Sequence, residues 1–159
     1  MATPSDGCLM LEVRRPSNAS LDAKGRLALP AVVRKALDAA NIEELVFAPH
    51  EESIWVWAPA DFKRLENEVA GADQFDESVQ DFVHGFLAMA EQSRIDGAGR
   101  VRISADLRDL VGLHKEVKIL SVLDRLEIWD RDVWMDRYKA ARARAPRRTP
   151  GRRSAGEDS

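Results

Sequence analysis

The sequence has little of what disulfide-built, membrane-spanning or metal-binding proteins need. It has one cysteine, Cys8, in 159 residues, and a single cysteine cannot form an internal disulfide or assemble a zinc site by itself. No apolar run approaches the ~18 residues of a membrane-spanning helix. The N-terminus has an early acidic residue and too short an apolar stretch for a signal peptide. We therefore expect a cytoplasmic protein with no membrane contact.

Signatures of catalysis and cofactor binding are also missing. The three histidines, His50, His84 and His114, are scattered, with no cysteine or carboxylate at metal-ligand spacing. No glycine-rich loop is followed by lysine and serine or threonine, as a phosphate cradle would require, and no nucleophile motif is present. We expect no enzyme, no cofactor and no metal, although the many carboxylates would allow an acid–base pair without a recognisable spacing.

The net charge of −3 is small, but the charges are unevenly distributed. Residues 1–130 carry 15 basic and 23 acidic side chains, whereas residues 131–159 carry 9 basic and 4 acidic ones. The acidic body would repel the phosphates of nucleic acid. Any anion binding must therefore come from local basic patches or from the C-terminal tail.

The chain contains the same unit twice. Residues 21–37 align with residues 95–111 at an offset of 74, and the match resumes farther on at an offset of 72. Two matching blocks in the same order indicate an internal repeat. The identical pairs of the first block are Asp22/Asp96, Gly25/Gly99, Arg26/Arg100, Ala31/Ala105 and Arg34/Arg108; the second block aligns Ile54, Val56, Trp57 and Phe62 with Leu126, Ile128, Trp129 and Trp134.

Each unit is predicted to contain a short strand, a short helix, a hairpin and a closing helix. Pro30 as a first-turn proline and Ser104 as an N-cap mark the starts of the short helices, and Gly112 marks a stop. The expected elements are strands around Leu27 and Val101, helices over 31–39 and 105–111, hairpins of 45–48 with 54–58 and of 117–122 with 125–129, and closing helices from near Pro59 and near Asp130.

A further helix is expected between the two units, over residues 74–92. Its apolar residues recur at helical spacing, which favours core packing over a binding role. They are Phe75, Val79, Phe82, Val83 and Phe86.

Residues 22–26 and 96–100 have the composition of tight connections between strands. Aspartate suits the first position of a type I turn, and glycine three residues later can adopt a positive φ. The arginine that follows, Arg26 or Arg100, would pair with the aspartate while the site is empty. One such turn alone would indicate only a hairpin, but no turn requires an arginine in the same place twice.

Local charge favours a role for both turns in binding nucleic acid. Residues 22–35 carry four basic side chains and one acidic one, and residues 94–108 carry four and two. A preorganised guanidinium suits phosphate contact and bidentate recognition of guanine, which is worth about 1–3 kcal/mol of discrimination. One or two such pairs cannot specify a genomic site, but the assembly of many copies on repeated DNA could, through effective concentration.

The chain resembles the MraZ family of bacterial transcriptional regulators over residues 14–142. The segments that carry the resemblance are LDAKGRLALP, RIDGAGRVRIS, VWAPADF and LEIWDRDVW. The resemblance implies an α+β fold of two tandem β-rich AbrB/SpoVT-type units. These would be of the swapped-hairpin type, with pseudo-two-fold symmetry and with flanking and linking helices.

The resemblance also implies a function. Proteins of this family are nucleoid-associated, sequence-specific DNA binders that form ring-shaped homo-oligomers. They act on direct repeats upstream of their own division and cell-wall gene cluster, so a repressor is expected here. Carried over by motif, Arg26 and Arg100 would contact DNA, with Asp22, Gly25, Asp96 and Gly99 in the same loops; Lys24 matches the basic position of the first turn, and Ala98 replaces it in the second.

We divide the chain into five parts. The tail is rich in arginine and interrupted by prolines, so disorder is expected there. It would serve either as a solubilising segment or as a sequence-independent contact to DNA phosphates. The parts are an N-terminal extension over 1–13, a first unit over 14–73, a linking helix over 74–92, a second unit over 93–142 and a basic tail over 143–159.

Two other functions compete with that of a transcriptional regulator. The first is an AbrB-like antitoxin, which usually combines one DNA-binding unit with a toxin-binding tail; the two fused units and the basic tail disfavour it. The second is a structural oligomer in which Arg26 and Arg100 form salt bridges between subunits. In that case an exposed Trp55 or Trp57 would mark the interface, since strand alternation places Ile54 on the opposite face.

Overall fold

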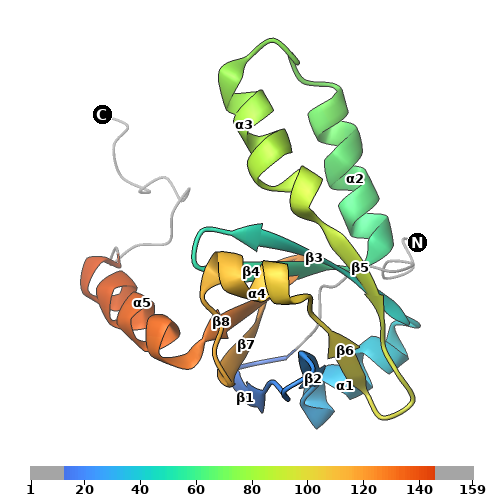
Figure 1. Cartoon of the computed structure of the whole chain (residues 1–159), viewed down its shortest axis with the longest axis vertical. Helices are drawn as coiled ribbons and strands as arrows, with labels where there is room; N and C mark the ends of the chain where they lie inside the picture. The colour runs from blue at the N-terminus through green and yellow to red at the C-terminus, as the bar shows by residue number, and fades with distance from the viewer. Residues whose placement is uncertain (1–12, 146–159) are drawn as a thin grey trace, which may run out of the picture.

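A computed structural model of the chain describes residues 13–145 (Figure 1). The predictions for Cys8, for most of the N-terminal extension and for residues 146–159 of the tail lie outside the described residues. The elements are β1 Ser17–Ser20, β2 Arg26–Ala28, α1 Ala31–Ala39, β3 Glu44–His50, β4 Ser53–Trp57, α2 Pro59–Ala70, α3 Glu77–Gly85, the 3-10 helix η1 Leu87–Met89, β5 Glu91–Arg94, β6 Arg100–Arg102, α4 Ala105–Val111, β7 Glu116–Val122, β8 Arg125–Asp130 and α5 Arg131–Arg144.

The two halves of the chain exchange strands. One antiparallel sheet has the order β1-β7-β8-β4-β3-β5, and a separate two-stranded ribbon pairs β2 with β6. Strand β1 of the first half thus pairs with β7 of the second half, and β5 of the second half pairs with β3 of the first half. The expected α+β fold of tandem β-rich units is confirmed. Because the strands are exchanged, neither half could complete its sheet alone.

The strand pairings show that a pseudo-two-fold axis relates the two halves of the chain. In the β4–β8 pair, Ile54 faces Ile128 and Val56 faces Leu126, on either side of a central pair. In the ribbon, Leu27 faces Val101, and Val101 is the residue that corresponds to Leu27 in the repeat. An axis through these central pairs exchanges the two halves of the sequence, so the arginine of one turn lies near that of the other.

The core lies between the sheet, the ribbon and the two short helices. Helix α1 buries Val33 and Leu37, and α4 buries their repeat counterparts Leu107 and Val111. Ser104 Oγ accepts a hydrogen bond from the N–H of Leu107 at 3.2 Å, so Ser104 caps α4 as expected. Helix α4 ends at Gly112, whose φ of 70° is left-handed. Pro30 immediately precedes α1 instead of occupying its first turn.

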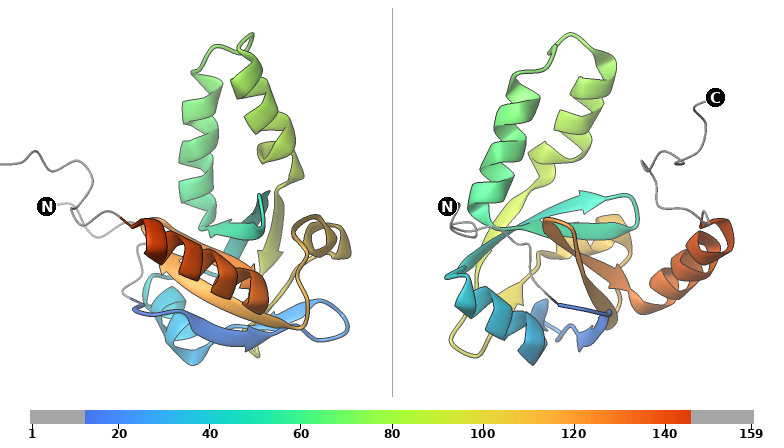
Figure 2. Two further views of the ribbon diagram at one scale, coloured as in Figure 1. Left: turned by 90° about the vertical axis from the view of Figure 1, so that its left-hand side faces the viewer. Right: turned by 180° about the vertical axis from the view of Figure 1, so that it is seen from behind.

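Helices α2 and α3 form a hairpin that projects from the sheet (Figures 1 and 2). At its base, Phe86 is buried with Trp57 and Phe62, and its ring centroid lies 5.5 Å from that of Trp57. This face of the sheet is therefore covered near β4. Strand alternation correctly places Trp57 on the face opposite the main core. It also suggests that Trp57 is exposed, which is wrong because the helical hairpin covers this side chain.

The helix expected over residues 74–92 is shorter. Asp76 starts α3 by accepting a hydrogen bond from the N–H of Ser78 at 2.8 Å, which leaves Phe75 before the helix and 91% exposed. Residues Glu91–Arg94 pair with the edge of β3 and form a strand. The prediction that all five apolar residues pack in the core is therefore wrong for Phe75. Phe86 is buried and Phe82 packs against its cluster, whereas Val79 and Val83 are only half-buried. The division of the chain into units stays a prediction.

Helix α5 is longer than the composition of the tail suggests. It continues to Arg144, two residues into the segment expected to be disordered. Alanine and arginine are strong helix formers, so residues 140–144 extend the helix. The helix ends before Ala145, the residue that precedes Pro146, in agreement with the restriction that proline places on its predecessor.

Candidate nucleic-acid interface

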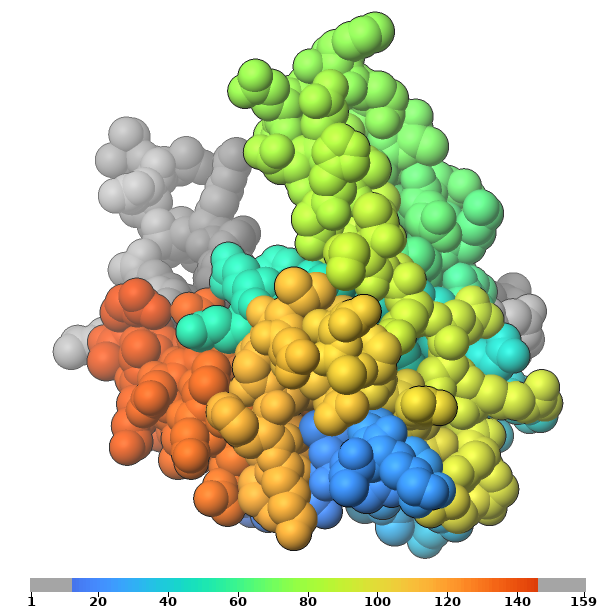
Figure 3. Space-filling model, viewed as in Figure 1, coloured from blue at the N-terminus to red at the C-terminus, as the bar shows by residue number. Residues whose placement is uncertain are grey.

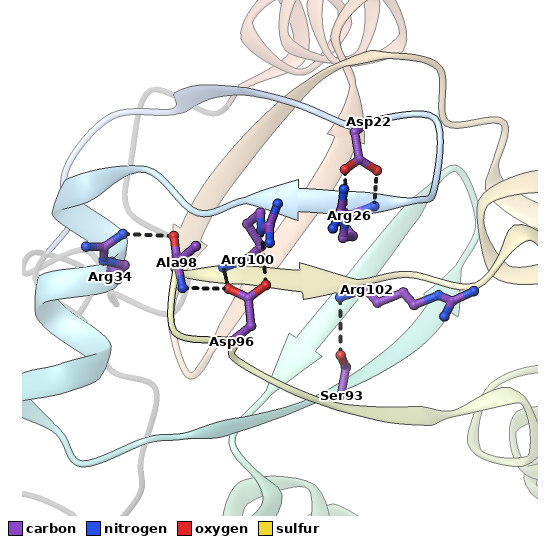
Figure 4. Close-up of polar contacts among 8 residues, drawn as sticks. All are labelled: Asp22, Arg26, Arg34, Ser93, Asp96, Ala98, Arg100 and Arg102. Atoms are coloured by element: carbon purple, nitrogen blue, oxygen red, sulfur yellow. Dashed lines mark hydrogen bonds and ion pairs between the residues drawn. The ribbon is translucent and has the colours of Figure 1, made fainter.

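The two aspartate–arginine turns have nearly the same geometry (Figure 4). Asp22 Oδ1 accepts the N–H groups of Lys24 and Arg26, both at 2.9 Å, and Asp22 Oδ2 accepts Arg26 Nε at 2.6 Å. In the second turn, Asp96 Oδ1 accepts the N–H groups of Ala98 at 2.9 Å and Arg100 at 2.8 Å, and Oδ2 accepts Arg100 Nε at 3.0 Å. Each carboxylate therefore fixes both its turn and its arginine.

The antiparallel β2–β6 ribbon brings the two arginines together. Arg26 faces Arg102 across the ribbon, and Ala28 faces Arg100. Because side chains alternate along a strand, Leu27 and its neighbour in β6 point into the core while these four residues share the outer face. The side chains of Arg26 and Arg100 are each 36% exposed.

Each turn is also held by the other half of the molecule. Arg34 on α1 donates a hydrogen bond from Nη1 to the carbonyl of Ala98 at 3.1 Å and packs against Gly99. Reciprocally, Arg108 on α4 packs against Gly25. The backbone repeats the exchange: the N–H of Leu29 donates to the Gly99 carbonyl at 3.0 Å, and the N–H of Ile103 donates to the Gly25 carbonyl at 2.9 Å.

Sequence reasoning overlooked three of these arginines. Arg34 and Arg108 occupy the same position in the two repeats, and this identity could have indicated a shared role. Their contacts to the opposite turn follow from the strand exchange, which the sequence alone does not specify. Arg102 has no basic counterpart in the first unit, so no repeat signal marks it. Its strand alternation with the buried Val101 was the only indication that it shares a face with Arg100.

The exposed location of the two turns suits contact with a large ligand. Figure 3 shows the blue residues around the first turn at the molecular surface, bordered by gold and yellow residues of the second half. One open hollow beside the ribbon is lined by both turn arginines and Arg108, and a second one by Arg26 and Arg108. Since each arginine uses Nε to bind its aspartate, the terminal Nη1 and Nη2 groups remain available for an acceptor. Two parallel N–H groups are the donor set that recognises a phosphate or guanine.

His50 and His114 have separate structural contacts and do not share a site. His114 Nδ1 lies 3.0 Å from Asp130 Oδ1, and the His50 ring stacks on Trp55 with centroids 3.8 Å apart. Trp55 also contacts the guanidinium of Arg125, 3.6 Å from the ring centroid. Within residues 13–145, no group of three or more His, Cys, Asp and Glu side chains could hold a metal ion. The described helices also include none long and apolar enough to cross a membrane.

Both turn carboxylates are stabilised in their charged form. A hydrogen bond from the N–H of Arg26, joined by one from its guanidinium, lowers the pKa of Asp22 below the ordinary 3.8, against a smaller opposing effect of burial. The N–H and guanidinium of Arg100 lower the pKa of Asp96 in the same way. A carboxylate with a lowered folded-state pKa stabilises the fold above its unfolded pKa, and this contribution is lost as the pH falls.

We therefore expect acid to weaken the turns. As the pH falls from about 5 to about 3, across the unfolded aspartate pKa of roughly 3.9, the free energy of unfolding should decrease. The decrease should be smaller in Asp22→Asn/Asp96→Asn, since asparagine keeps an acceptor but does not titrate. Urea unfolding at a series of pH values measures this difference. Asp38→Asn, at an exposed position of α1, is the control; equal curves for the double variant and wild type would contradict the prediction.

Comparison with known proteins places the chain in a family. The family model described as "MraZ protein, putative antitoxin-like" matches residues 15–83 and 86–157. A relative named "Transcriptional regulator MraZ" from Saccharopolyspora erythraea is 37% identical over 114 residues, which cover 72% of this chain and 78% of the relative. Proteins of the same name from Rhodococcus jostii and Mycobacterium avium are 36% and 34% identical, covering 76% and 73% of this chain and 82% and 79% of those proteins.

The two matched segments correspond to the two halves that exchange strands, and each segment contains one aspartate–arginine turn. The similarity to the relatives also extends over about three quarters of the chain. On this evidence the chain belongs to the MraZ family.

Proposed function

We propose that the protein is a sequence-specific DNA-binding transcriptional regulator. It acts as a repressor on direct repeats upstream of its own division and cell-wall gene cluster. The observation that carries this proposal is the doubled turn, which presents two oriented guanidinium groups on one exposed ribbon. The name "Transcriptional regulator MraZ" of the relatives supports the same function.

The residues of the turns have separate roles in this proposal. Arg26 and Arg100 bind guanine edges or phosphates through their terminal nitrogens. Asp22 and Asp96 hold the guanidinium groups in place before DNA arrives, so less side-chain entropy is lost on binding. Lys24 lies in the first turn and contacts a phosphate as a flexible point charge. Gly25 and Gly99, with φ of 78° and 74°, allow the tight turns.

Self-association provides the specificity that one ribbon lacks. Two arginine–guanine pairs supply about 2–6 kcal/mol of discrimination, so several linked subunits on repeated sites are needed. Helix α5 supports self-association, because it buries no residue and leaves Met135 and Tyr138 about 40% exposed. We infer a ring-like homo-oligomer, located in the cytoplasm and associated with the nucleoid.

Binding to the DNA upstream of the protein's own gene tests the function. The full chain should bind that fragment more tightly than a scrambled fragment of equal length at 150 mM salt, measured by fluorescence anisotropy. A reporter driven by the same fragment should be expressed less when the protein is present. Equal affinity for both fragments together with an unchanged reporter would overturn the proposal. Formation of a complex with a co-expressed toxin under those conditions would favour the antitoxin alternative.

A further inference from the structure

The two ends of the β2–β6 ribbon carry unequal numbers of positive charges. Within the turns and the ribbon strands, two repeat positions differ in charge: Lys24 corresponds to Ala98, and Arg102 corresponds to Ala28. Arg102 lies directly opposite Arg26, the strand residue that follows the first turn. Both additional cations therefore lie at the same end of the ribbon, although they come from different halves of the chain.

These cations border one open hollow of about 410 Å³. None of the residues that line it is acidic. Arg108 contributes from α4, where its Nε donates to the Ile103 carbonyl at 3.2 Å. The lining residues are Ala23, Lys24, Arg26, Arg102 and Arg108.

Within the described part of the chain, the positive charge of this hollow is only partly neutralised. Asp22 pairs with Arg26, but the ammonium group of Lys24 and the guanidinium group of Arg102 form no ion pair or hydrogen bond with residues 13–145; only their backbone N–H groups are bonded, to Asp22 and Ser93. Figure 4 shows Arg102 extending away from the Asp96–Arg100 pair, so that carboxylate does not reach it. Like charges directly opposite in a β pair are destabilising, and an anion between Arg26 and Arg102 would remove that repulsion.

We propose that this hollow binds one backbone phosphate of DNA, and that the contact fixes the direction in which each ribbon lies on its site. The proposal rests on the proposed function, because it assumes that the ribbon docks on DNA. Phosphate contacts position a protein on the duplex without reading its sequence. A charge-assisted cluster of guanidinium and ammonium groups suits that role.

Without this phosphate contact, the direction in which the ribbon lies on its DNA site is poorly defined. The pseudo-two-fold axis through the Leu27–Val101 pair exchanges Arg26 with Arg100, so the ribbon could dock on a duplex in either of two orientations with the same arginine contacts. A phosphate contact at one end makes the two orientations unequal. Arg102 and Lys24 are the residues that create the inequality.

The first experiment is a salt titration of binding to the upstream fragment by the full-length protein. Arg102→Ala should lower the slope of log affinity against log salt concentration by about one, since one fewer counterion is released. Preference over scrambled DNA should stay at the wild-type ratio. Arg102→Lys should keep the wild-type slope. Lys63→Ala, which removes an exposed cation from α2, is the charge-matched control and should also keep it.

The second experiment locates the phosphate. Uncharged methylphosphonate linkages are placed one at a time along a duplex that contains a single binding site. For the wild type, a linkage on one side of the site should weaken binding, and the symmetry-related linkage should not. Arg102→Ala should lose this sensitivity. Ala28→Arg should gain it at the symmetry-related linkage, because the second end of the ribbon then carries an arginine at the position that corresponds to Arg102.

The outcomes separate this proposal from the proposed function. If the wild type prefers the upstream fragment but Arg102→Ala matches Lys63→Ala in slope and in methylphosphonate profile, the phosphate site is wrong and the DNA-binding function stands. If the wild type shows no preference for the upstream fragment, both proposals are overturned. Circular dichroism melting of each variant verifies that folding is unchanged.

Discussion

Replacing Arg26 and Arg100 together by alanine is expected to abolish the preference for the upstream fragment. Each bidentate arginine–guanine contact is worth about 1–3 kcal/mol of discrimination, so the double variant should lose about 2–6 kcal/mol per ribbon. The loss is larger for an oligomer that binds through several ribbons at once. Fluorescence anisotropy on specific and scrambled duplexes measures it directly.

The fold should tolerate this double substitution. Both arginines are partly exposed and pair with aspartates that are 38% and 40% exposed, and exposed ion pairs contribute little to stability. Arg94→Ala/Arg131→Ala is a matched control, since these arginines are also exposed and lie near Glu43 and Asp132, at 3.3 Å and 3.7 Å. Retained preference in the turn variant, or an equal loss in the control, would mean that the turns do not read DNA.

Local patterns in the sequence predicted the turns well. Aspartate at the first position and glycine three residues later are determined by short-range backbone chemistry, and in both turns the arginine side chain pairs with the aspartate as expected. The repeat predicted that the two arginines form an equivalent pair. Helices α1 and α4 match the expected bounds: Ser104 and the left-handed Gly112 cap the two ends of α4, and Pro30 directly precedes the first residue of α1.

Contacts between the halves were beyond the reach of these patterns. Arg34 lies 64 residues from the carbonyl it binds, and no short-range rule relates the two. The burial of Trp57 depends on Phe86 at the base of the helical hairpin, so strand alternation alone predicted the wrong environment. Phe75 was misassigned because periodic spacing continued across Asp76, where the helix begins. In each case tertiary packing decided the environment of a residue whose local pattern was ambiguous.

Replacing each of three glycines of the turns by alanine is expected to change the free energy of unfolding by very different amounts. Gly25 and Gly99 have φ of 78° and 74°, a conformation that costs an L-residue roughly 1–2 kcal/mol. Gly97 has no positive φ of this kind, and a Cβ there would meet nothing within 4 Å. Its counterpart in the first turn is already alanine, Ala23. Gly97→Ala should therefore be neutral or stabilising by up to about 1 kcal/mol, since alanine restricts the unfolded chain.

The two left-handed glycines should also differ from each other. A Cβ on Gly25 would lie 2.7 Å from the backbone carbonyl oxygen of Ile103. This oxygen accepts a hydrogen bond from Arg108, and the N–H of Ile103 donates to the Gly25 carbonyl. A Cβ on Gly99 would instead meet the side chain of Arg34, which can move away. We expect Gly25→Ala to cost about 2–4 kcal/mol and Gly99→Ala about 1–3 kcal/mol, by analogy with strained backbone positions.

Urea unfolding measures the order of these stability losses. One fixed protein concentration is used, since self-association makes the apparent stability depend on concentration. The ranking Gly25→Ala, Gly99→Ala, Gly97→Ala links stability to the exchange of strands between the halves. Gly25 and Gly99 are restricted by residues of the opposite half, whereas Gly97 is not. If all three variants unfolded at the same urea concentration, the close approach of each turn to the other half would not exist in solution. The two arginines would then lack a common support, and their joint orientation on one ribbon would lose its structural basis.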